Sequence, residues 1–294
     1  MSHQTPTSQS KKRVQDFLLT LGIVICVLVG VGALVYPMVR NSLNDVMVER
    51  IMSTQEKQQK SAREISEQMA KRQEMARQKS LKDPYSQESL NELTYDPITL
   101  PIYAKHMIGE VYLATIKQYL PIFDNSSEQF LQVGATWLVT SSPISGGVGN
   151  HSVLAGHSGI PSATLFNDVP QLKKGELIIY KIAGNYLAYE VVNINKVTAN
   201  DATAISHDAD KDQTTLVTCV PIGINSHRLL VTGERVPFTP DMLKKVKAMQ
   251  ASKKTNHLWL WIGLGLFVIL FLIYLLFQVR KLRRRRKYET LVEV

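Results

Sequence analysis

The sequence predicts a mainly β domain, either a closed barrel or a sandwich, with a long apolar helix on each side of it. Three observations support this. Between residues 102 and 238, short runs rich in Val, Ile, Leu, Tyr and Thr alternate with Gly, Pro, Asn and Ser. Helical patterns are few in this region. Two uncharged apolar stretches flank it, at 17–38 and 258–279.

Each apolar stretch is long enough to form a helix that crosses a bilayer. A basic cluster precedes 17–38, and another follows 258–279. Because positive residues mark the cytoplasmic side, we expect cytoplasmic ends at 1–16 and 280–294 and an extracellular region between the spans. A cleaved secretory signal peptide is the alternative for the first stretch.

The charge distribution follows this topology. The chain has a formal net charge of +9, yet residues 39–257 carry 24 basic and 22 acidic residues, and the two ends carry 10 and 3. The basic ends therefore indicate contact with anionic membrane lipid. The tail "RKLRRRRK" lacks interleaved aromatic residues, so nucleic acid is excluded as a partner.

Helical segments are predicted on both sides of the β domain. Residues 41–80 contain neither Gly nor Pro and have sparse apolar residues at helical spacing, which predicts one or two membrane-proximal helices within 39–82. Prolines at three positions end this pattern and define a linker over 83–101. A basic helical connector is predicted at 239–257.

Seven strands and two short helices are predicted within 102–238. The strands are Gly109–Thr115, Gln118–Phe123, Ser152–Ala155, Leu177–Ile182, Leu187–Val197, Thr214–Cys219 and Arg228–Glu234. The helices are 126–134, capped by Ser126 or Ser127 and stopped by Gly134, and 162–169.

The two cysteines, Cys26 and Cys219, cannot pair within one chain if Cys26 lies in the bilayer, so no disulfide framework is expected. Cys219 is either buried filler or a reactive thiol. It ends a predicted strand, a rigid yet reachable position that suits a nucleophile. A return of the chain over 220–227 would bring Arg228 level with it, and a guanidinium there favours the thiolate and stabilises an oxyanion.

A cysteine nucleophile also needs a group that carries protons, and histidine is the usual one. His157 lies between glycines after a predicted strand, where a loop side chain can reach a cleft, so it is favoured. His151 and His227 remain alternatives. The histidines show no metal-binding spacing, and no glycine-rich phosphate loop follows a strand, so neither a metal nor a cofactor is expected.

Three stretches together, "LAGHSG", "TLVTC" and "HRLLVTGER", resemble the signature blocks of the sortases, membrane-bound cysteine transpeptidases of Gram-positive bacteria. The resemblance covers about 102–236. It implies a closed eight-stranded β-barrel. It also implies Cys219 as the nucleophile, His157 as the acid and base, and Arg228 as the oxyanion stabiliser.

A finer resemblance is to class C, the pilus-assembling sortases. It rests on "GINSHRLLVTGERV", on the C-terminal apolar stretch with its basic tail, and on "DPY" at 83–85, which is similar to the lid motif of that class. The resemblance implies that Asp83, Pro84 and Tyr85 form a lid, in which Asp83 pairs with Arg228 and Tyr85 covers Cys219. Asp96–Pro97 is a competing lid candidate, although Ile98 follows it instead of an aromatic residue.

The resemblance implies cleavage of an LPxTG-like sorting signal and joining of pilin subunits through a lysine isopeptide bond, with pilins or surface proteins as partners. Two alternatives stay open. One is a sortase that attaches surface proteins to peptidoglycan, and the other is a membrane-tethered β domain that acts as a scaffold without catalysis.

Overall fold

The computed structural model describes residues 7–57, 61–76, 83–91, 94–160, 163–199, 201, 205 and 208–292. The chain divides into two compact units, residues 1–238 and 239–294. The first unit contains the β domain, and the second consists of one helix.

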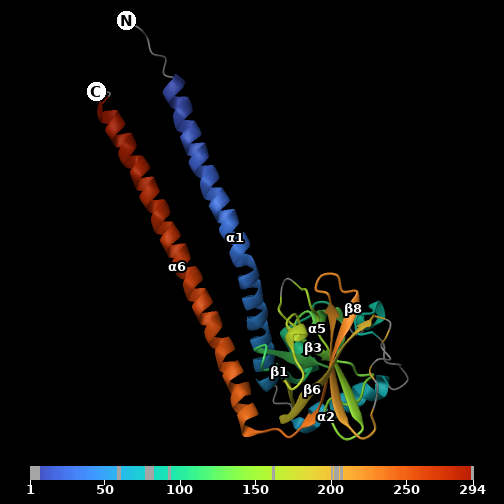
Figure 1. Cartoon of the computed structure of the whole chain (residues 1–294). Coiled ribbons are helices and arrows are strands. Elements are labelled where there is room, and N and C mark those ends of the chain that lie inside the picture. The colour runs from blue at the N-terminus through green and yellow to red at the C-terminus, as the bar shows by residue number, and fades with distance from the viewer. Residues whose placement is uncertain are drawn as a thin grey trace. The chain divides into compact units, whose positions relative to one another are not determined.

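The β domain is a closed barrel (Figure 1). Within the described residues its strands number eight: β1 (Met107–Leu113), β2 (Gln118–Phe123), β3 (Ala135–Trp137), β4 (Asn150–Ala155), β5 (Leu177–Ile182), β6 (Asn185–Thr198), β7 (Asp212–Val220) and β8 (His227–Val236). The strand order around the barrel is β1-β2-β3-β4-β7-β8-β6-β5. Because β5 pairs with β1, the sheet has no free edge. The barrel is confirmed, and the sandwich alternative is wrong.

Two of the strand pairs are parallel, β2 with β3 and β4 with β7. In the second pair Ala155 lies opposite Val217. Parallel strands end at the same side of a sheet, so the loop after β4 and the end of β7 lie together. β7 and β8 are antiparallel neighbours joined by the turn 221–226. The topology therefore gathers three chain segments at one end of the barrel.

The seven predicted strands are all present, and none of their ends differs from the predicted one by more than two residues. The sequence did not reveal β3, because Ala135–Trp137 has only three residues, all buried, and so lacks an alternating pattern. The predicted helix 162–169 is wrong: residues 165–168 form a turn, followed by the 3-10 helix η1 (Val169–Gln171). Leu165 has a φ of 38°, which no α-helix contains.

The helices of the first unit are α1 (Thr7–Lys57), α2 (Ala62–Ala76), α3 (Gln87–Leu90), α4 (Leu100–His106) and α5 (Glu128–Leu131). The helices predicted over 41–80 are present as the end of α1 and α2; residues 58–60 and 77–80 lie outside the described residues. α5 begins after Ser127, one of the two expected caps, and ends before Gly134. The linker 83–101 contains α3 and the start of α4.

The barrel interior is packed with aliphatic and aromatic side chains. Trp137, Phe166, Tyr180 and Tyr189 are among its largest fully buried members. Burial of each such side chain contributes about 1.5–3 kcal/mol to folding. This core makes the barrel a rigid support for the groups at its ends.

α2 docks on the barrel through apolar and polar contacts. Ile65, Met69 and Ala76 belong to the same apolar cluster as the barrel interior. Arg72 donates to the Asp124 carbonyl oxygen from Nε at 3.1 Å and from Nη2 at 2.8 Å. Asp124, which is buried, also contacts His106 Nδ1 at 2.6 Å and accepts from Gln68 Nε2 at 2.9 Å. The lid segment follows α2 closely in sequence.

The second unit consists of α6 (Pro240–Val292), which includes the predicted helical connector. Both predicted spans are helical, 17–38 within α1 and 258–279 within α6. Among the residues that the structure describes, a search for a helix with the length and apolarity needed to cross a membrane finds none. The two spans are therefore not confirmed.

Candidate active site

Cys219 and Arg228 are cross-strand partners. Cys219 is the second-last residue of β7 and Arg228 the second residue of β8, and their Cα atoms lie opposite each other in the antiparallel register. Directly opposed residues have Cβ atoms about 4.5–5.5 Å apart. The expected return of the chain over 220–227 is confirmed, and it places the guanidinium beside the thiol.

The thiol is covered. Cys219 is only 5% exposed. This burial raises its pKa from the ordinary 9.0 to about 11; Arg228 opposes the shift and Asp83 adds to it. A thiol in this state is almost entirely protonated at neutral pH, and the nucleophile is the thiolate. The burial of Cys219 therefore disfavours its reactive form in this conformation.

His157 lies in the loop that follows β4. Its neighbour Gly156 donates its N–H to the Val217 carbonyl at 3.1 Å, which continues the β4–β7 pairing. Ser158 Oγ donates to the Cys219 carbonyl at 2.5 Å. His157 is thus held between two residues that are both tied to the end of β7. Its side chain is 15% exposed.

The alternative histidines have other surroundings. His151 is buried near the start of β4, and its Nε2 contacts Thr215 Oγ1 at 2.7 Å. His227 contacts Ser226 Oγ through Nδ1 at 2.9 Å at the start of β8. The imidazole of His157, in contrast, stacks on the ring of Tyr85.

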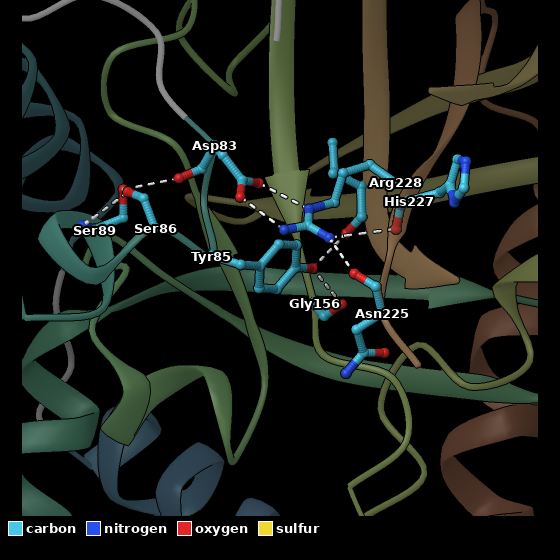
Figure 2. A network of polar contacts seen from close by, with 9 residues as sticks. Asp83, Tyr85, Ser86, Ser89, Gly156, Asn225, His227 and Arg228 are labelled. Atoms are coloured by element: carbon cyan, nitrogen blue, oxygen red, sulfur yellow. Dashed lines mark hydrogen bonds and ion pairs between the residues drawn. The ribbon is translucent and has the colours of Figure 1, made fainter. Parts of the chain in front are cut away.

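Asp83 and Arg228 form the expected pair (Figure 2). Arg228 donates from Nε to Asp83 Oδ1 at 2.9 Å and from Nη2 to Oδ2 at 2.7 Å. This two-point geometry is the strong form of an arginine–carboxylate contact. The hydrogen bonds raise the pKa of Arg228, which keeps the guanidinium charged. The competing candidate Asp96 is not the partner of Arg228.

Tyr85 lies between the groups that the sequence singled out. Its ring stacks on His157 with centroids 5.4 Å apart, and the Arg228 guanidinium lies 5.0 Å from its centroid. Its hydroxyl donates to the carbonyls of Gly156 at 2.7 Å and Val217 at 2.9 Å (Figure 2). Burial, followed by the nearby Cys219, raises the pKa of Tyr85 well above its ordinary value, so the hydroxyl remains a donor.

A short helical turn fixes the shape of the lid. The Asp83 carbonyl accepts from Ser86 N–H and from Ser89 Oγ, both at 3.1 Å (Figure 2). Ser86 is the N-cap of α3, and its Oγ accepts from Ser89 N–H at 3.3 Å. Tyr85 and Leu90 pack against the apolar cluster that contains Val217 and Leu230. The predicted lid segment Asp83–Tyr85 is therefore held by hydrogen bonds and apolar contacts.

A mostly apolar pocket lies beside the lid. Asp83 and Pro84 line it together with Arg228 and with side chains of β6, β7 and β8 and the segments near them. Its apolar walls include Leu138, Val197, Val217, Ile205 and Leu230.

The sequence did not reveal Glu128, the first residue of α5. Its Oε2 contacts His157 Nε2 at 2.9 Å. The two residues are 29 positions apart, and an acidic residue in the first turn of a helix is ordinary in any protein. Only the folded chain brings this carboxylate to the imidazole.

The fold and the site define a class of protein: a closed β-barrel that holds a cysteine, a histidine and an arginine around the ring of Tyr85. The sequence model of the sortase domain family matches residues 111–236. The chain belongs to the sortase family, whose members are cysteine transpeptidases.

Individual relatives agree with this. Sortase A of Bacillus anthracis is 34% identical over 132 residues, which cover 45% of this chain and 61% of that protein's length. Sortase C2 of pilus island 1 of Group B Streptococcus is 35% identical over 60% of this chain and 97% of that chain, with a TM-score of 0.50. Sortase C1 of Streptococcus agalactiae is 31% identical over 62% and 89%, with a TM-score of 0.51.

Proposed function

We propose that this protein is a pilus-assembling sortase of class C, a cysteine transpeptidase that cleaves an LPxTG-like sorting signal and links pilins through a lysine isopeptide bond. One observation carries the proposal: His157 and Arg228 both contact Tyr85, beside Cys219, and Asp83 pairs with Arg228. The similarity to a pilus-island sortase C supports the pilin substrate.

In the first step the Cys219 thiolate attacks the carbonyl carbon of the Thr–Gly bond. Arg228 donates hydrogen bonds to the developing oxyanion, and His157 gives its proton to the leaving glycine amine. The carbon–nitrogen bond breaks, and the threonyl group remains on sulfur as a thioester. The apolar pocket beside Arg228 suits the apolar part of the sorting signal.

In the second step a lysine amine of the next pilin attacks the thioester. His157 takes a proton from this amine, the carbon–sulfur bond breaks, and Cys219 leaves as the thiolate. The product is an amide between the threonine carboxyl group and the lysine side chain. After the second step the Cys219 thiolate and the protonated His157 are regenerated. These two groups and Arg228 supply the chemistry, so the proposed reaction needs no metal or cofactor.

The lid must leave before either step can occur. Asp83 occupies Nε and Nη2 of Arg228, which are the donors that an oxyanion needs. Tyr85 occupies the space beside His157. We therefore assign the structure to a self-inhibited state, in which Asp83, Pro84 and Tyr85 prevent access to the thiol.

A second candidate function is the attachment of surface proteins to peptidoglycan. It has the same chemistry up to the thioester and differs in the amine that resolves it. The similarity to a sortase A favours it. The acceptor, lysine side chain or cell-wall precursor, distinguishes the two candidates.

We also propose that the protein is held in the cell membrane by residues 17–38 and 258–279, with the barrel outside the cell and both ends in the cytoplasm. The apolar composition of the two stretches and their basic flanks support this. Tethering to the surface that holds the substrate would raise their effective concentration. Retention in the membrane pellet after alkaline carbonate extraction is the expected result, and release into the supernatant contradicts it.

The experiment that tests the proposed function uses the full chain, purified pilin and a lid-open variant, Asp83→Ala with Tyr85→Ala. We expect covalent pilin ladders on denaturing gels and none when Cys219→Ala is added. Ladders of equal intensity without Cys219 would exclude the proposal. Mass spectrometry of the linkage identifies the acceptor, and transfer to a cell-wall precursor alone would favour the second candidate.

A further inference from the structure

Glu128 contacts the histidine of the proposed site. Its Oε2 lies 2.9 Å from His157 Nε2. The side chains of Glu128 and His157 are 42% and 15% exposed, so the contact lies near the surface and the imidazole is its more buried partner. Nothing in the reaction described above uses this carboxylate.

The position of Glu128 is fixed by its own helix. Phe130 and Leu131, two and three residues later in α5, are both fully buried. Gln132 donates from Nε2 to Glu128 Oε1 at 3.1 Å, so each carboxylate oxygen has a partner. The helix start is held as well, since Ser127 N–H donates to Asn125 Oδ1 at 2.9 Å.

An ionised carboxylate can only accept hydrogen bonds, so the contact requires a proton on Nε2 of His157. Nδ1 is then the nitrogen that remains to exchange a proton with the leaving glycine amine and the incoming lysine amine. We infer that Glu128 is a positioning residue that fixes the tautomer and orientation of His157, directing Nδ1 to the reacting groups. This inference rests on the proposed function.

The inference applies most strongly to the open state. In the closed state the Tyr85 ring also stacks on His157. Opening of the lid removes that stack, because Tyr85 belongs to the lid. Glu128 belongs to α5, which lies outside the lid segment, so its contact persists and orients the imidazole during turnover.

The test compares Glu128→Ala and Glu128→Gln with the parent in the full chain of the lid-open variant. Steady-state kinetics use a fluorogenic peptide that carries an LPxTG-like signal. A positioned proton carrier contributes roughly 10²–10⁴-fold, so we expect kcat to fall roughly 10- to 100-fold for alanine, with KM unchanged. Glutamine keeps an acceptor at the same reach and should lose less.

A second readout reports on the imidazole itself. In ¹⁵N-histidine-labelled protein, at a pH where the imidazole is neutral, we expect the His157 signal of the Nε2–H tautomer in the parent. We expect a mixture of tautomers for Glu128→Ala. The His157→Gln variant assigns the signal. Glu190→Gln, at an exposed position of β6, removes the same charge elsewhere and should change neither readout.

The outcomes separate the two proposals. If the lid-open parent does not cleave the peptide, the proposed function fails. If the parent is active, three results for Glu128→Ala overturn the positioning role. These are an unchanged kcat, a change in KM alone, and a lower kcat with no change of the His157 tautomer. Thermal unfolding of each variant checks that the fold is retained, and the glutamine variant decides the matter if alanine unfolds the protein.

Discussion

Asp83 and Arg228 lie 145 positions apart in the chain and form a two-point ion pair, with N–O distances of 2.9 and 2.7 Å. The carboxylate takes the place that a reaction oxyanion would need. The guanidinium lies beside the thiol on the next strand. In the proposed mechanism, activity and inhibition therefore depend on the same arginine.

The hydroxyl of Tyr85 should hold the lid closed. Tyr85→Phe keeps the ring but removes the hydrogen bonds to Gly156 and Val217. The hydroxyl has one proton to share between the two carbonyls, and its loss is worth about 0.5–1.5 kcal/mol, so we expect the Cys219 thiol to react roughly 2- to 10-fold faster with iodoacetamide. Tyr186→Phe, whose ring stacks on Phe238, is the control and should leave the rate unchanged. Equal rates for both variants would show that the hydroxyl does not hold the lid.

The pH dependence of thiol alkylation should differ between closed and open proteins. Burial and Asp83 raise the pKa of Cys219 to about 11 in the closed state, so thiolate and reactivity increase only as the pH rises toward that value. In the variant with Asp83→Ala and Tyr85→Ala, both raising effects weaken and Arg228 still lowers the pKa. We expect the midpoint of the alkylation profile to move to lower pH. Superimposable profiles would argue against a lid over the thiol.

Arg228→Lys tests whether the planar guanidinium, and not only its charge, is needed. Lysine keeps the charge but cannot make the two-point contact. In the lid-open variant we expect kcat for peptide cleavage to fall roughly 10²–10³-fold, the usual loss for an oxyanion donor. Circular dichroism should show an unchanged fold. A fully active lysine variant would limit the role of Arg228 to charge.

His157 and His151 should separate catalysis from stability. His157→Gln removes the proposed proton carrier, and we expect cleavage in the lid-open variant to fall roughly 10²–10⁴-fold with little change in the melting temperature. His151→Gln alters a buried contact with Thr215, so a lower melting temperature with an unchanged kcat is expected. A large loss of kcat for His151→Gln, with none for His157→Gln, would instead assign the proton carrier to His151.

The buried cluster around Asp124 should stabilise the docking of α2. Asp124→Ala removes the buried carboxylate that lies 2.6 Å from His106 Nδ1 and 3.6 Å from Arg72 Nε, while Arg72 keeps its hydrogen bonds to the backbone carbonyl. Removal of one member of a buried charged group costs about 3–5 kcal/mol, so we expect a clearly lower midpoint in urea unfolding. Asp241→Ala, which breaks an exposed pair with Lys244, should change stability by about 0.5 kcal/mol or less. Similar losses for both variants would refute the role of the cluster.

The barrel strands were accessible to sequence reasoning because most of them are long enough for Val-, Ile- and Thr-rich runs to stand out between Gly, Pro and Asn. β7, with "DQTTLVTCV", is such a case. The short strand β3 could not be recognised in this way. The segment 162–169 was misassigned as a helix because the spacing of its apolar residues suits one. There the packing of Leu165 and Phe166 into the core, both almost fully buried, decides the backbone.

The "DPY" motif likewise has a local part that the sequence predicts and a tertiary part that it does not. "DPY" marks a proline turn, and resemblance to class C suggested its partner, yet nothing local in the sequence specifies contact with a strand far along the chain. Glu128 has no distinguishing motif at all. Its approach to His157 results from the position of α5 between β2 and β3, which the order of strands around the barrel determines.

By itself the sequence determined the β-rich domain, the apolar flanking stretches, the family and the three residues Cys219, His157 and Arg228. These features depend on local composition, spacing and motifs, which are preserved in the linear chain. Only the tertiary structure decided that the lid lies closed, that Tyr85 stacks on His157, and that Glu128 accompanies the imidazole. Such contacts join segments that are distant in sequence, and closure of the barrel is what brings them within hydrogen-bond reach.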